Sequence, residues 1–147
     1  MLAAKAFRSW LGSVLTCVAA LAVWIAAAHI ISGRTQYLLH NMIDVSIAFG
    51  SVFAIVAAVL YVPAFGLLTA ILKRPLGRMT AVAVGALLAP AAYLAVAMTF
   101  RESEDPQTIS AWLAYAARNL PGLAIGVLPF VTGGAVFGLL WSAEPRR

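Results

Sequence analysis

Four stretches of the sequence are almost wholly apolar and long enough to cross a lipid bilayer. They cover residues 10–32, 44–72, 80–100 and 120–142. A spanning helix needs about 20 mostly apolar residues, because each residue rises 1.5 Å and the hydrocarbon core is roughly 30 Å thick. The apolar positions do not alternate with polar ones, as they would in the strands of a membrane barrel. The pattern predicts an all-α integral membrane protein, with residues 1–147 forming one transmembrane domain built as a four-helix bundle.

Two features extend this four-helix pattern. The second stretch is too long to stand upright in the hydrocarbon, since 44–72 corresponds to about 43 Å of helix. We therefore expect that helix to tilt or to protrude, with Thr35 as a cap for a helical start near Gln36. Before the fourth stretch, Asp105 and Pro106 suit an N-cap and a first helical position. Helically spaced apolar residues then predict a short amphipathic helix at about 106–118, on the outer membrane face or over the bundle's outer end.

The composition agrees with a membrane protein and excludes other classes. Apolar residues make up 63% of the chain and charged residues only 10%, against roughly 25% in soluble domains. So few charges cannot cover the surface of a soluble domain, and so apolar a chain would not remain disordered. The net charge of +5 is spread over short clusters at helix ends. Such clusters fit anionic lipid headgroups better than nucleic acid, so we expect the bilayer, and no nucleic acid, as the partner.

The distribution of basic residues predicts the orientation. Three segments on one side of the membrane hold seven of the ten basic residues. These seven are Lys5, Arg8, Lys73, Arg74, Arg78, Arg146 and Arg147. The positive-inside rule then places both termini in the cytoplasm. The abundance of alanine, and of arginine over lysine, is typical of GC-rich bacterial genomes and favours a bacterial inner membrane.

The first stretch has a second interpretation as a cleaved signal peptide, since it combines a basic start with an apolar run. The run of about 20 residues exceeds the usual 7–15 of such a segment, which favours a retained helix. Aromatic residues also mark the expected membrane interfaces, with Phe7, Trp10 and Trp141 on the inner side and Tyr37 and Phe100 on the outer side.

The fourth stretch is rich in glycine, and a small pair also occurs on the second stretch. Small residues spaced four apart let two membrane helices approach closely. The predicted helix-packing residues are Gly122, Gly126, Gly133, Gly134, Gly138, Gly50 and Ala54. They are expected to pack within the bundle or, alternatively, to bind another membrane protein or a second copy through the fourth helix.

Three prolines fall inside the predicted spans. Pro63, Pro90 and Pro129 each remove one backbone hydrogen bond and are expected to kink the second, third and fourth helices. Interrupted helices line the binding sites of many transporters. Proline is also common in ordinary membrane helices, so structural kinks are the simpler interpretation.

Residues that could perform chemistry are scarce. His40 and Asp44 share a helix face, but no spacing ties His29 to them, so we expect no metal site. Cys17 lies within the first span without an activating base and is expected to be an inert thiol. Neither a catalytic motif nor a phosphate-binding loop is recognisable. We therefore expect no enzymatic activity and no cofactor.

These observations favour a non-enzymatic accessory or assembly subunit that acts through helix–helix packing. The alternative is a small oligomeric transporter or channel with proline-interrupted helices.

Overall fold

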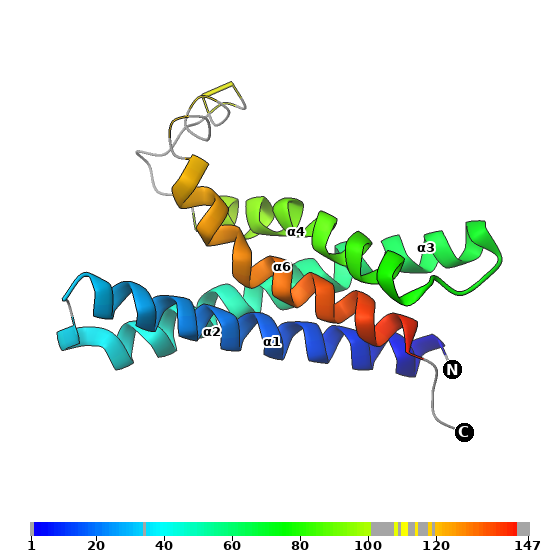
Figure 1. The fold of residues 1–147 in the computed structure, drawn as a ribbon, viewed down its shortest axis with the longest axis horizontal. Helices are drawn as coiled ribbons and strands as arrows, with labels where there is room; N and C mark the ends of the chain where they lie inside the picture. Colours follow the sequence, from blue (N-terminus) through cyan, green and yellow to red (C-terminus); the bar gives the residue numbers. More distant parts are fainter. Residues whose placement is uncertain are drawn as a thin grey trace.

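The chain folds into a bundle of long helices (Figure 1). The computed structural model describes residues 2–33, 35–100, 108, 110–111, 114, 118 and 120–143. Nearly all of these residues are helical, and no strand occurs among them. Four helices in this part of the chain are long and apolar enough to span a membrane. The prediction of an all-α, four-helix membrane protein is therefore confirmed.

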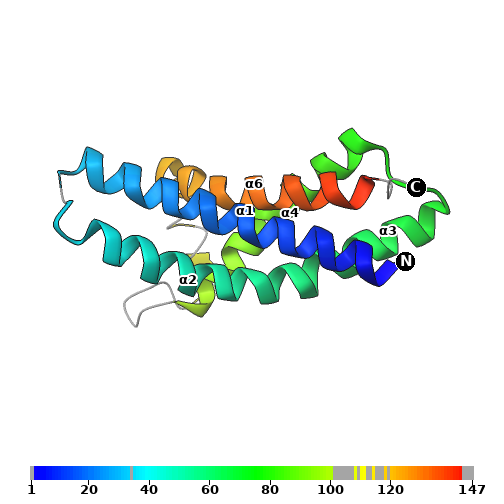
Figure 2. The ribbon, with the colours of Figure 1, turned by 90° about the horizontal axis from the view of Figure 1, so that it is seen from below.

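The helices follow one another up and down the bundle. The first span is α1 (Leu2–Ile31). The second span follows a short 3-10 turn, η1 (Thr35–Tyr37), and consists of α2 (Leu38–Val56), a π-helical turn η2 (Ala57–Tyr61) and α3 (Val62–Leu72). The third and fourth spans are α4 (Arg78–Thr99) and α6 (Leu120–Ser142). Figure 2 shows α1 and α2 lying antiparallel side by side.

The ends of these helices differ from the predicted spans for local reasons. Helix α1 begins at Leu2 rather than at residue 10, because the preceding segment is rich in alanine, a strong helix former. It ends at Ile31, two residues before Gly33, whose φ of 69° suits the left-handed conformation that often follows a helix. Helix α3 ends at Leu72, and the Lys73 cap that follows also has a positive φ, two residues before Pro75.

Pro63 changes the hydrogen-bond pattern of the second span. In a regular α-helix its ring would clash with the carbonyl four residues earlier, at Val59. The preceding turn is π-helical, and the Val62 N–H donates to the Ala57 carbonyl, five residues back. The wider turn gives the proline ring room. Pro90 and Pro129, by contrast, lie inside α4 and α6, which continue through them.

The predicted amphipathic helix at 106–118 lies largely outside the described residues. Among those described, Ser110, Ala111, Ala114 and Arg118 are helical. Thr108 Oγ1 accepts a hydrogen bond from the Ala111 N–H at 3.2 Å, which is the geometry of an N-cap. The cap predicted at Asp105 lies outside the described residues.

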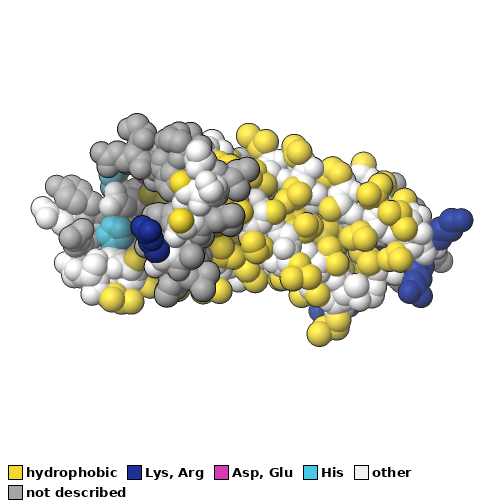
Figure 3. Space-filling model, turned by 90° about the horizontal axis from the view of Figure 1, so that it is seen from above, with side chains coloured by type: hydrophobic (Ala, Val, Ile, Leu, Met, Phe, Trp, Pro, Cys, Tyr) yellow, Lys and Arg dark blue, Asp and Glu magenta, His cyan; other side chains and the backbone are white. Residues whose placement is uncertain are grey.

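The two ends of the bundle carry different side chains. We call the end formed by the start of α1, the α3–α4 loop and the end of α6 the basic end (Figure 1). It carries Lys5, Arg8, Lys73, Arg74 and Arg78. On the face that Figure 3 shows, hydrophobic side chains are spread over the surface between the two ends. This distribution is the one expected of a protein whose middle lies in hydrocarbon.

Helix α6 is the central element, because it packs against both α4 and α1. Its contact with α4 is made by the two backbones. A Cβ atom on Gly134 would overlap the carbonyl of Gly85, and one on Gly138 would overlap the carbonyl of Ala81. Any side chain larger than hydrogen at Gly85, Gly134 or Gly138 would force the two helices apart.

A seam of aromatic rings fills the space between α6 and the second span. Phe53, Tyr61 and Phe65 come from the second span, and Phe137 and Trp141 come from α6. The rings contact one another with centroid separations such as 5.3 Å for Tyr61–Phe137 and 5.1 Å for Phe65–Phe137. All five are buried. Trp141, expected at the inner membrane interface, has a side chain that is only 1% exposed and packs within this seam.

The contact between α4 and α6 makes a direct prediction. Gly134→Ala should destabilise the protein by about 3 kcal/mol, the upper end of the usual overpacking cost, because the added methyl meets backbone that cannot move aside. The melting temperature of the detergent-purified protein would measure this loss. Gly66→Ala is the matched control, since a Cβ at Gly66 has no neighbour within 4 Å. Equal stability of the two variants would contradict the close contact.

Candidate functional site

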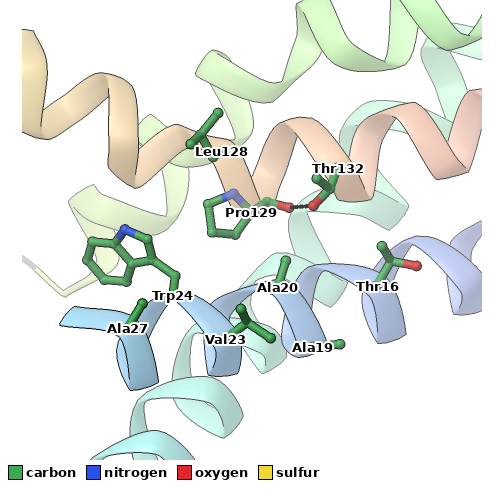
Figure 4. Close-up of a pocket in the computed structure, with 9 residues that line it drawn as sticks. All are labelled: Thr16, Ala19, Ala20, Val23, Trp24, Ala27, Leu128, Pro129 and Thr132. Atoms are coloured by element: carbon green, nitrogen blue, oxygen red, sulfur yellow. Dashed lines mark hydrogen bonds between the residues drawn. The ribbon is translucent and has the colours of Figure 1, made fainter. Parts of the chain in front are cut away.

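An apolar groove lies on the outside of the bundle, between α1 and α6 (Figure 4). Its volume is about 530 Å³. The described residues that line it are Thr16, Ala19, Ala20, Val23, Trp24 and Ala27 from α1, with Leu128, Pro129 and Thr132 from α6. These positions lie in the middle of both spans, so the groove opens at membrane depth.

The groove forms where α6 turns away from α1. At Gly133 the two helices are close, because a Cβ at that position would lie 3.0 Å from Cys17 Cβ and 3.2 Å from the Ser13 carbonyl. Toward its Leu120 end α6 diverges from α1, as Figure 1 shows. The groove lies between the two diverging helices, with Pro129 on one wall and Trp24 on the other (Figure 4).

The helical repeat places the small α1 residues on the side that faces the groove. Thr16, Ala20, Val23 and Ala27 are separated by four, three and four residues, so they fall on one face. The alanines give the groove a shallow floor, close to the α1 backbone. A helix that entered the groove could therefore approach α1 closely.

The two threonines in the groove do not offer their hydroxyl protons to it. Thr16 Oγ1 donates to the Gly12 carbonyl at 2.8 Å, and Thr132 Oγ1 donates to the Pro129 carbonyl at 2.7 Å (Figure 4). Both bonds turn the hydroxyl back toward its own helix, as is usual in membrane helices. Among the residues that the structure describes, no ionisable side chain lines the groove. The groove therefore suits an apolar ligand and offers neither a metal ligand nor an acid or base.

The predicted helix-packing residues of α6 face the inside of the bundle wherever the structure describes their surroundings. Gly134 and Gly138 face α4, and Gly133 faces α1 and the ring of Phe53. A Cβ at Gly126 would lie 3.4 Å from the Tyr93 hydroxyl oxygen. Gly122 also belongs to α6, in a part whose side-chain surroundings are not described. A partner could reach α6 through the groove without displacing these contacts.

Gly50 and Ala54 lie at the contact between α1 and α2. A Cβ on Gly50 would overlap the side chain of Val18. The Ala54 carbonyl accepts a hydrogen bond of 2.7 Å from Trp10 Nε1. The indole of Trp10 therefore joins two spans, a role beyond the interfacial position expected for it.

The two histidines lie at the end opposite the basic end, and each contacts different partners. His29 Nδ1 donates to the Ile25 carbonyl at 2.9 Å, and Asn41 Nδ2 donates to His29 Nε2 at 3.0 Å. His40 Nε2 lies 3.0 Å from Asp44 Oδ2 on the exposed face of α2. In the described part of the chain no three His, Cys, Asp or Glu side chains come together as a metal site would require.

Most residues of the groove were missed by sequence reasoning. Pro129 was singled out as a helix kink, but Trp24 and the alanines of α1 were not. A signal was present, because Thr16, Ala20 and Ala27 repeat at helical spacing. That signal is weak in a chain so rich in alanine, and only the divergence of α6 turns this face into a hollow. The chain matches no known protein family, and neither curated proteins nor solved structures contain a match to it.

Proposed function

We propose that the protein is a non-enzymatic accessory or assembly subunit that binds a transmembrane helix of another membrane protein in the groove between α1 and α6. The observation that carries the proposal is the groove itself: an uncharged hollow at membrane depth with a floor of small residues. Helix association in membranes depends on close van der Waals packing, which small residues permit. A mainly apolar helix has the matching chemistry.

A different protein suits the groove better than a second copy does. In a symmetric dimer the same surface patch meets itself. Two copies facing each other through this groove would place hollow against hollow and would leave the space unfilled. If the groove bound another face of a copy, the contact would repeat without closing unless it formed a ring. The shape therefore favours a convex helix from a different protein.

The alternative of a small oligomeric transporter or channel has less support. It depends on the prolines as interruptions of membrane helices. Helices α4 and α6 continue through Pro90 and Pro129, and Pro63 follows a π-helical turn. Transporter sites typically use unwound segments that expose backbone groups to a substrate. The described spans contain no such segment, so the subunit proposal is preferred.

Site-specific photo-crosslinking in native membranes tests the proposal. A photoreactive amino acid at Val23 should form a product with a discrete membrane protein, and the attached peptide should come from a transmembrane segment. The same label at Leu87 on α4 is the matched control, because the exposed fractions of the two side chains are 70% and 78%. The Leu87 label lies outside the groove and should give no such product.

A second substitution tests whether the product depends on the groove. Ala19→Trp fills the groove and should reduce the Val23 product at least about fivefold, as expected for an overpacking cost of roughly 1 kcal/mol. Ala83→Trp is the control at an exposed alanine outside the groove. Labelling of lipid alone, or of a second copy alone, would contradict the proposal.

We further propose that the basic end faces the cytoplasm of a bacterium and that the protein lies in the inner membrane. The positive-inside rule supports this orientation. The start of α1, the α3–α4 loop and the end of α6 share one end of the bundle (Figure 1), so a single orientation satisfies all the basic segments.

Cysteine labelling in intact cells tests this orientation. In a Cys17→Ala background, Lys73→Cys should resist a membrane-impermeant thiol reagent, whereas Gln36→Cys should react. Both positions are exposed at helix ends, so a difference between them reports the side of the membrane and not burial. Lysed cells should label at both positions. The reverse pattern in intact cells would overturn the orientation.

A further inference from the structure

A second hollow lies at the basic end, between the start of α4 and the end of α6. Its volume is about 330 Å³, and it is lined by Arg78, Leu139, Leu140, Ser142 and Ala143. At about 30 Å³ per water molecule this equals roughly ten waters. The space is thus larger than a single ion needs, and it has a cationic edge beside apolar walls.

The two nearby arginines play different roles. Arg8 Nη2 donates to the Leu140 carbonyl at 3.1 Å and to the Ala143 carbonyl at 3.2 Å. These bonds give hydrogen-bond donors to carbonyl groups at the end of α6, where the helix dipole is negative and a cation is favourable. Arg78 has no hydrogen-bond or ion-pair partner within the described part of the chain, and its side chain is exposed. Its charge is therefore available to a ligand.

The surroundings of Arg78 favour an anion. Lys73 and Arg74 lie in the adjoining loop, and the only carboxylate among the described residues, Asp44, belongs to the opposite end of the bundle. The α4 N-terminus adds a weaker contribution, because its Gly77 cap residue provides no side-chain hydrogen bond. Arginine binds phosphate oxygens through several parallel donors and keeps its charge at any physiological pH.

We infer that this hollow binds the headgroup of an anionic phospholipid. The phosphate would pair with Arg78, and the adjoining acyl chain would follow the apolar side chains of Leu139 and Leu140. A free phosphate would use only the cationic edge and would leave the apolar walls uncovered. The combination of a free cation, apolar walls and a position at the end of the spans therefore favours a lipid over a soluble anion. This inference is independent of the groove between α1 and α6.

A thermal-shift titration of the purified full-length protein tests the inference. A ligand that binds only the folded state raises the melting temperature. Phosphatidylglycerol should do so, whereas phosphatidylcholine at the same concentration should have little effect. Inorganic phosphate and glycerol phosphate are titrated in parallel, as soluble compounds that carry the phosphate without acyl chains. A shift from either one equal to the lipid's shift would show a phosphate site and would overturn the lipid assignment.

Variants separate a site from general charge attraction. Arg78→Gln should weaken the apparent affinity for phosphatidylglycerol about fivefold, equivalent to roughly 1 kcal/mol, the upper value for one exposed ion pair. Arg74→Gln removes the same charge from the neighbouring loop without removing a contact to the phosphate, and screening by solvent and salt should keep its effect below about twofold. Equal losses in the two variants would show nonspecific attraction and would overturn the site. Ala143→Phe keeps every charge but fills the hollow, and it should also weaken binding; unchanged affinity there would contradict the inference.

Discussion

The backbone contact between α4 and α6 is the constraint on which the rest of the structure depends. In water, burial of apolar side chains would hold two such helices together, but lipid tails are as apolar as the helices themselves. Association must then come from contacts that lipid cannot match, and close backbone approach provides them. Gly85 and Gly134 meet without an intervening side chain. This contact fixes α6 against α4 and leaves its opposite side free to pack on α1.

The placement of α6 determines where large side chains are needed. Neighbouring helices meet through small residues, as at Gly133 between α6 and α1 and at Gly50 between α2 and α1. The second span and α6 are bridged instead by stacked and edge-to-face aromatic rings, including Phe53 against Phe130 at 5.4 Å. Such ring pairs add roughly 0.5–1.5 kcal/mol each beyond area burial. The bundle therefore combines small residues at the helix contacts with large ones at its centre.

Sequence reasoning recovered the number and type of the helices because the apolar stretches are long and their ends are charged. It also singled out Gly133, Gly134 and Gly138, which lie where α6 meets α1 and α4. It did not find their partners, because Gly85 and Ala81 lie in an alanine-rich helix where small residues are common and carry little information. The groove between α1 and α6 could not be predicted from the sequence either. It depends on the angle at which two helices diverge, and no local spacing encodes that angle.

The bond between Arg8 and the end of α6 has a consequence for the order in which the protein is built. Chains are synthesised from the N-terminus, so α1, α2–α3 and α4 emerge from the ribosome before α6 does. The helix that makes the close backbone contact with α4 is therefore the last of the four to be inserted. Until then Gly85 faces lipid or a chaperone, and Arg8 lacks its acceptors at Leu140 and Ala143. The contacts between α1 and α2 do not need α6, whereas α4 gains its main packing partner only when α6 lies between α1 and α4.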